Sequence, residues 1–144
     1  MKRLVCFICL LGLLLSACSF EEHAEAIPEE NYDYGIYQLT FKEKNISNDS
    51  VGNDWLFTYT YNSKPIKSGY RVTQSLDEFS FQSIDVEVRE KDKIDDVGIG
   101  TLKVAICGVG SGKTEVTVTE TDGRFKGNAA VWEISCEVKM VGKQ

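Results

Sequence analysis

Two acidic stretches of this 144-residue chain have the composition of loops that bind a cation, namely Asn48–Trp55 and Ile84–Gly100. Within the second stretch, Glu90 and Asp92 occupy alternate positions, so an extended backbone points both carboxylates to the same side. Calcium is bound by six to eight oxygen atoms, many of them from carboxylates. Without a cation, each close carboxylate pair near a protein surface repels by up to about 4 kcal/mol. The stretches predict either a calcium site or an ordinary solvated loop in which lysines separate the acids.

Residue types give little support to nucleophilic catalysis. A serine or cysteine nucleophile usually needs a neighbouring base, and the single histidine of the chain, His23, lies in a polar N-terminal stretch. A zinc site would lack ligands for the same reason. The later part of the chain has no histidine, and its two cysteines are widely separated. A serine–lysine arrangement, or a pair of carboxylates that acts on a sugar, stays open. A carboxylate-dependent hydrolase is therefore one alternative function.

The stretch Gly110–Thr114 has part of the pattern of a nucleotide-binding P-loop. The full pattern requires a glycine at the position that Cys107 occupies, and it is followed by a helix whose N-terminus holds phosphate. Glu115–Glu120 alternates between polar and apolar residues like a strand instead. We therefore expect a glycine-rich hairpin turn and no nucleotide ligand.

The N-terminus has the layout of a secretory signal. Lys2 and Arg3 precede an apolar run of about 12 residues, which is too short to span a bilayer, and the run ends in Leu15-Ser16-Ala17-Cys18. This stretch resembles the lipobox of bacterial lipoprotein precursors. The resemblance implies removal of residues 1–17, a lipid (palmitate) on Cys18, and an anchor on the outer face of the cell membrane. In a host with two membranes, Ser19 after the lipidated residue is similar to lipoproteins of the outer membrane.

Residues 18–33 read as an acidic, flexible tether, because they are rich in glutamate and poor in apolar side chains. The whole chain has a net charge of −6, and removal of residues 1–17 takes away two of its 16 basic residues and none of its 22 acidic ones. The remaining chain then carries −8, which disfavours nucleic acid and anionic lipid as nonspecific partners.

After removal of the signal, two cysteines remain beside Cys18. Cys107 and Cys136 would lie outside the cytoplasm, where disulfides persist. Cys136 falls in the apolar stripe of its strand, whereas Cys107 is out of phase with the apolar residues before it. The sequence therefore leaves open whether the two form a disulfide.

From residue 34 onward, polar and apolar residues alternate over short segments separated by turn residues, and no helical periodicity is evident. Seven or eight short strands without helices predict an all-β fold, an antiparallel β-sandwich over residues 34–144. The expected strands are Tyr37–Phe41, Trp55–Tyr61, Tyr70–Thr73, Glu78–Gln82, Ile84–Arg89, Leu102–Ile106, Val116–Thr119 and Ala130–Met140.

The two acidic stretches, each placed between a strand and the next, also resemble the loops of C2 domains. These are β-sandwiches whose end loops bind calcium through carboxylates. The departures are a glutamate at position 90, a short loop after it, and Trp55 where the family has proline. By this resemblance the calcium ligands would be Asp49, Asp54, Glu90, Asp92 and Asp96 (or Asp95).

The leading functional hypothesis is a membrane-anchored β-sandwich that binds protein or carbohydrate, with calcium as a candidate cofactor. Exposed aromatic residues and Arg124 could anchor such a ligand, and burial of Trp55, Tyr59 and Tyr61 would weaken this idea. The alternatives are the hydrolase and a structural envelope protein without a ligand.

Overall fold

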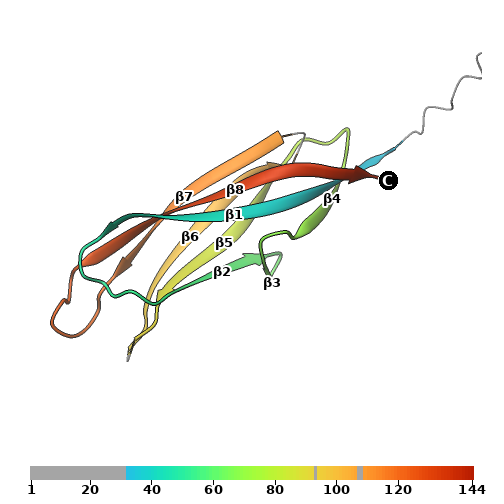
Figure 1. Ribbon diagram of the computed structural model, residues 1–144. Coiled ribbons are helices and arrows are strands. Elements are labelled where there is room, and N and C mark those ends of the chain that lie inside the picture. Colours follow the sequence, from blue (N-terminus) through green and yellow to red (C-terminus); the bar gives the residue numbers. More distant parts are fainter. Residues whose placement is uncertain (1–31, 93, 107–108) are drawn as a thin grey trace, which may run out of the picture. The chain divides into compact units, whose positions relative to one another are not determined.

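The computed structural model describes residues 32–92, 94–106 and 109–144, and every regular element among them is a β-strand. The strands pair in antiparallel fashion and form two four-stranded sheets (Figure 1). The predicted all-β antiparallel sandwich is thus confirmed. The strands are β1 (Tyr34–Asn48), β2 (Trp55–Tyr61), β3 (Lys64–Ile66), β4 (Arg71–Ser75), β5 (Ser80–Glu90), β6 (Asp96–Ile106), β7 (Val109–Thr119) and β8 (Ala129–Lys143).

Long strand pairs form the centre of each sheet. The first sheet has the order β4-β1-β8-β7, and its two central strands pair from Gly35↔Lys143 to Asn48↔Ala130. The second sheet has the order β3-β2-β5-β6, and β5 pairs with β6 from Ser80↔Ile106 to Glu90↔Asp96. Several strands are longer than the sequence pattern predicts: β1 continues to Asn48, and β5 is a single strand where we expected two.

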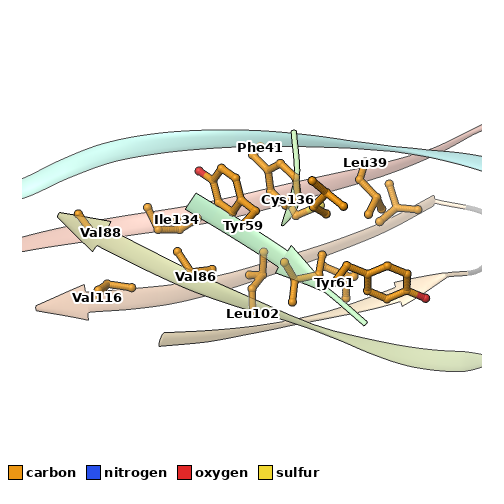
Figure 2. Close-up of a cluster of buried hydrophobic side chains, with 14 of the residues drawn as sticks. Leu39, Phe41, Tyr59, Tyr61, Val86, Val88, Leu102, Val116, Ile134 and Cys136 are labelled. Carbon is orange, nitrogen blue, oxygen red and sulfur yellow. The ribbon is translucent and has the colours of Figure 1, made fainter. Parts of the chain in front are cut away.

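The core lies between the two sheets and consists of inward-facing residues at alternate positions along their strands (Figure 2). Leu39 and Phe41 of β1 are buried, and the rings of Phe41 and Tyr59 of β2 stack with centroids 4.0 Å apart. Cys136 is fully buried, in keeping with its place in the apolar stripe of β8. Members of this core that are fully buried also include Ile84, Val88, Leu102, Val104, Ile106, Val118 and Ile134.

The glycines at the start of β7 serve a close contact between strands, so the predicted hairpin turn at Gly110–Thr114 is wrong. These residues lie inside β7, where Gly112 pairs with Cys136. A Cβ atom at Gly110 or Gly112 would overlap a backbone carbonyl oxygen of β6, that of Ala105 or Lys103. Glycine is therefore required here because the edge strands of the two sheets approach backbone to backbone.

Three connections gather at one end of the sandwich: β1–β2 (residues 49–54), β5–β6 (residues 91–95) and β7–β8 (residues 120–128). The arrangement follows from strand direction, because β1, β5 and β7 all run toward this end (Figure 1). The opposite end holds the start of β1 and the end of β8, where Tyr34 and Gln144 exchange backbone hydrogen bonds of 3.0 and 2.9 Å. Both acidic stretches noted in the sequence thus meet at a single end.

Candidate functional site

A pocket of about 590 Å³ opens at this end, and we call it the end pocket. All three connections contribute to its wall, so residues far apart in the sequence face a common space. Its charged residues are acidic, whereas its neutral polar residues come from the end of β1 and the β1–β2 connection. The lining residues are Asn48, Ser50, Gly52, Asn53, Glu90, Asp92, Glu120 and Phe125.

Glu90, the last residue of β5, is the most unusual group of the pocket. Glu90 is only 3% exposed, and its Oε2 atom is buried without a hydrogen-bond donor among the described residues. Burial is the main cause that raises the pKa of this carboxyl, and the charges of neighbouring acids, Asp92 first, raise it further. An unpaired buried carboxyl is costly, so its presence in a pocket wall marks a candidate binding position.

The β1–β2 connection lies directly against Glu90. Gly52 has a left-handed backbone with φ of +79°, and a Cβ atom there would overlap the Glu90 carboxyl. Asn48 fixes the shape of this connection: its Oδ1 accepts a bond of 2.8 Å from the Val51 amide, and its Nδ2 donates one of 3.0 Å to the Gly52 carbonyl. Val51 is fully buried and anchors the loop in the core. The wall over Glu90 is therefore built by packing and by defined hydrogen bonds.

Asp96, the first residue of β6, connects the second and third loops. It is 2% exposed, and its Oδ1 accepts bonds of 2.9 Å from the Thr121 amide and 2.6 Å from the Thr121 hydroxyl. These bonds hold the start of the β7–β8 connection and so position Glu120 in the pocket wall. Desolvation raises the pKa of Glu120, and the charges of Asp96 and Asp92 together with a hydrogen bond to Asp96 add to the effect.

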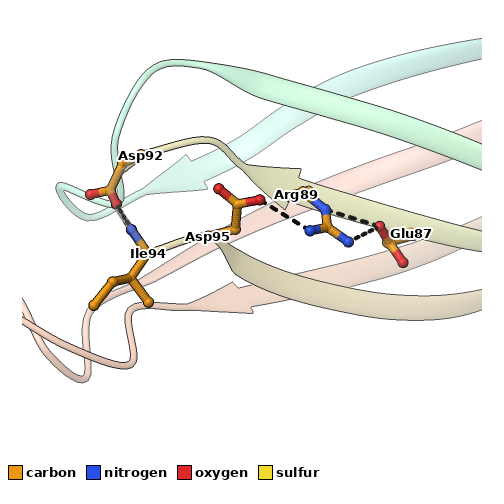
Figure 3. Close-up of polar contacts among 5 residues, drawn as sticks. All are labelled: Glu87, Arg89, Asp92, Ile94 and Asp95. Carbon is orange, nitrogen blue, oxygen red and sulfur yellow. Dashed lines mark hydrogen bonds and ion pairs between the residues drawn. The ribbon is translucent and has the colours of Figure 1, made fainter.

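The β5–β6 connection separates acids that belong to the pocket from acids that do not. Asp95 lies on the other side, where it forms an ion pair of 3.0 Å with Arg89, and Arg89 also pairs with Glu87 at 2.8 Å (Figure 3). Asp92 faces the pocket, and its Oδ1 accepts a bond of 2.6 Å from the Ile94 amide. Of the two alternatives drawn from the sequence, Asp96 is the one beside the pocket.

The predicted calcium ligands therefore occupy different positions. Glu90 and Asp92 line the end pocket, and Asp96 is buried beneath Glu120. Asp54 acts on the Glu90 carboxyl through its charge, and its carbonyl accepts a bond of 2.7 Å from the Lys91 amide. Asp49 is exposed and does not line the pocket.

Calcium fits this arrangement poorly. Within the described ranges, no group of three or more His, Cys, Asp or Glu side chains is arranged so that it could hold a metal ion. Calcium is bound by oxygen atoms that each lie roughly 2.3–2.6 Å from the ion. A calcium ion would therefore require the loops to bring their carboxylates closer together.

Two pocket residues lie outside both acidic stretches and were missed by the sequence reasoning: Glu120 and Phe125. Glu120 stands between an alternating strand and the turn signal Asp122-Gly123, so its place in a loop could be predicted. The residues that surround Glu120 in the pocket could not be predicted, because the order of the strands decides which loops meet.

The aromatic residues proposed as ligand anchors are mostly internal. Tyr59 and Tyr61 are buried in the core, and Trp55 is half-buried. Trp55 packs with Trp132, their ring centroids 5.2 Å apart, and pairs in register with Glu90. This burial weakens the hypothesis that these side chains form an exposed binding surface. Arg124 remains at the pocket end, with its guanidinium 5.5 Å from the centroid of Phe125.

Other predicted residues bear on the site less directly. Cys18, His23 and Cys107 lie outside the described residues, so the predicted lipidation and disulfide stay predictions. Burial raises the pKa of the Cys136 thiol to about 11.

Comparison with known protein families, with curated proteins and with solved structures finds no match to the chain. In the part of the chain that the structure describes, no helix is long and apolar enough to cross a membrane.

Proposed function

We propose that this chain is a lipid-anchored extracytoplasmic protein whose β-sandwich binds a cationic ligand in the end pocket. The lipobox-like stretch ending in Cys18 supports the anchor. The single observation that carries the ligand proposal is the unpaired Oε2 atom of Glu90 in the wall of the pocket. The proposal keeps the binding module predicted from the sequence and restricts the class of its ligand to one that carries positive charge.

The pocket has a negative potential that the described residues do not neutralise. Four ion pairs form among these residues, and none of them includes Glu90, Asp92 or Glu120. A bound cation would pair with the buried carboxylate and lessen the repulsion among the surrounding acids. The pocket therefore gains more from a cation than a solvated acidic surface would.

The position of the pocket also suits a binding module. Its wall is formed by loops that are fixed at their bases by Val51 and Asp96, as binding loops on a rigid scaffold commonly are. The meeting of acidic loops at one end of a sandwich supports the resemblance to C2 domains drawn from the sequence.

A carboxylate-dependent hydrolase is the second candidate, and one observation favours it. Glu90 and Glu120 have raised carboxyl pKa values and line the same pocket, so two acids could face one substrate. Release of reducing sugar from envelope polysaccharides by the full-length protein, lost in Glu120→Gln, would support this candidate.

Thermal melting of the full-length protein in detergent tests the binding proposal. A cation that occupies the pocket of the folded state raises the melting temperature by mass action. We expect calcium or an organic amine at millimolar concentration to raise it for the wild type and not for Glu90→Gln. The absence of a shift with every cation tested would contradict the proposal.

A further inference from the structure

The end pocket is large compared with the needs of one metal ion, and this size points to a class of ligand. Its volume of about 590 Å³ falls in the range typical of small-molecule sites, roughly 300–1,000 Å³. A second cavity of about 200 Å³ is lined by Ile94, Asp122 and Gly123 and shares Asp92 and Glu120 with the first. The two cavities therefore adjoin at these two acids.

Negative groups are distributed over these two adjoining cavities and do not converge on one point. Glu90 lies in the wall of the larger cavity, Asp92 and Glu120 border both cavities, and Asp122 lines the smaller one. Since no set of three such acids among the described residues is arranged around a metal position, a single spherical ion would satisfy only part of the charge. An extended ligand with separated positive groups would reach more of it.

Apolar side chains border the same two cavities. Phe125 borders the larger cavity and Ile94 the smaller one, and both are more than one-third exposed. The Arg124 guanidinium lies over the Phe125 ring, and this contact shows that the ring can pack against a positively charged group. Methylene groups of a ligand could pack on these surfaces while its charged groups contact the carboxylates.

We propose that the end pocket binds an aliphatic amine that carries two or more ammonium groups along an alkyl chain. The inference rests on the proposed function, since it names the ligand class of the same pocket. One ammonium group pairs with the Glu90 carboxylate and donates to a neutral oxygen of the β1–β2 connection. Another contacts Glu120 or Asp122, and the alkyl chain between them lies along Phe125 and Ile94. A free polyamine and a pair of lysine side chains on a protein partner share this chemistry.

Isothermal titration calorimetry of the full-length protein in detergent at physiological ionic strength tests the proposal. The probes are spermidine, an end-blocked Lys-Gly-Lys peptide, the same peptide acetylated on both side-chain amines, and calcium chloride. We expect at least one amine to bind about tenfold or more tightly than the acetylated peptide, because acetylation removes the charged donors. Binding of spermidine alone identifies a free polyamine, and binding of the lysine peptide alone identifies a protein partner.

Two variants and a matched control locate the binding. Glu90→Gln and Glu120→Gln should each weaken amine binding by about tenfold, the usual scale for loss of one charge-assisted hydrogen bond. Asp77→Asn removes one negative charge at an exposed position in the β4–β5 connection, at the far end of the sandwich, and should change affinity less than twofold, roughly the size of a screened long-range effect. Circular dichroism of each variant checks that the fold is intact.

The outcomes separate this inference from the proposed function. If calcium binds, Glu90→Gln abolishes its binding and neither amine exceeds the acetylated peptide, the cation site stands and the amine proposal falls. If no cation binds, both fall. Amine binding that is equal in the wild type and in both glutamine variants would also overturn the proposal, because the ligand would then lie elsewhere.

Discussion

Replacement of Glu90 by glutamine should make the unliganded protein more stable, although it removes the central group of the proposed site. Glutamine has nearly the same shape, so the contact with Gly52 is kept while the buried charge is lost. A buried group without a partner destabilises a protein by about 1–3 kcal/mol, and more when it is charged. We therefore expect the free energy of unfolding at pH 7.5 to rise by about 2 kcal/mol. For a domain of this size, this corresponds to an increase of about 8 °C in melting temperature.

The pH dependence gives this prediction its sign. The pKa of Glu90 is raised in the folded state above its ordinary value of 4.5, so the folded protein binds this proton more tightly than the unfolded chain does. The resulting stabilisation is fully present below pH 4.5 and is lost as the pH rises through the raised pKa. The difference in stability between Glu90→Gln and the wild type should therefore be small at pH 4 and largest above neutrality. Glu120, whose pKa is also raised, is present in both proteins.

Urea denaturation followed by tryptophan fluorescence, over a series of pH values, measures this difference. Asp77→Asn serves as the control, because loss of an exposed charge should change stability by less than about 0.5 kcal/mol at any pH. Two results would refute the reasoning: a Glu90→Gln protein no more stable than the wild type at pH 7.5, or a gain in stability that is the same at pH 4 and pH 7.5.

Three further predictions concern the scaffold and the anchor. Gly112→Ala should destabilise the protein by about 1–3 kcal/mol through overlap with the backbone of β6, whereas Gly142→Ala, where the nearest atom would be 3.6 Å away, should not; thermal melting of the pair decides this. Thr121→Val should lower stability by about 1–2 kcal/mol, because the buried Asp96 loses one of its two donors. Chemical denaturation checks that value, and retention of wild-type stability would contradict the anchoring role of this pair. Cys18→Ser should abolish incorporation of labelled palmitate and release the protein from the membrane fraction, and a labelled variant would disprove the lipobox assignment.

The fold could be predicted because the residue pattern that specifies each strand lies within a short segment of the sequence. Alternation of polar and apolar residues in segments such as Ile84–Arg89 reports directly which side chains face the core. Glycine carries no such direct signal, since it serves both tight turns and close contacts between backbones. The sequence predicts a turn at Gly110 and Gly112 because nothing in it reveals that the edge of the other sheet lies against them.

The candidate site could be predicted only in part, for a related reason. Glu90 and Asp92 stand out because they alternate on one extended segment, and both line the end pocket. Glu120 belongs to a third loop that is distant in sequence, and only the strand order brings it to the same end. The neutral Asn48 shapes the pocket more than its acidic neighbour Asp49, which charge alone could not indicate.

The pairing of β1 with β8 has a mechanical consequence. The chain enters the domain at Tyr34, whereas the end pocket begins where β1 ends, about 50 Å away for a strand of 15 residues. A ligand held in the pocket and pulled away from a membrane anchor at Cys18 would thus load the sheet along its strands. Because the β1–β8 hydrogen bonds lie across the strands, this force shears the whole ladder from Gly35↔Lys143 to Asn48↔Ala130 together and does not open it one bond at a time. The long β1–β8 ladder would therefore resist tension applied between Tyr34 and the end pocket.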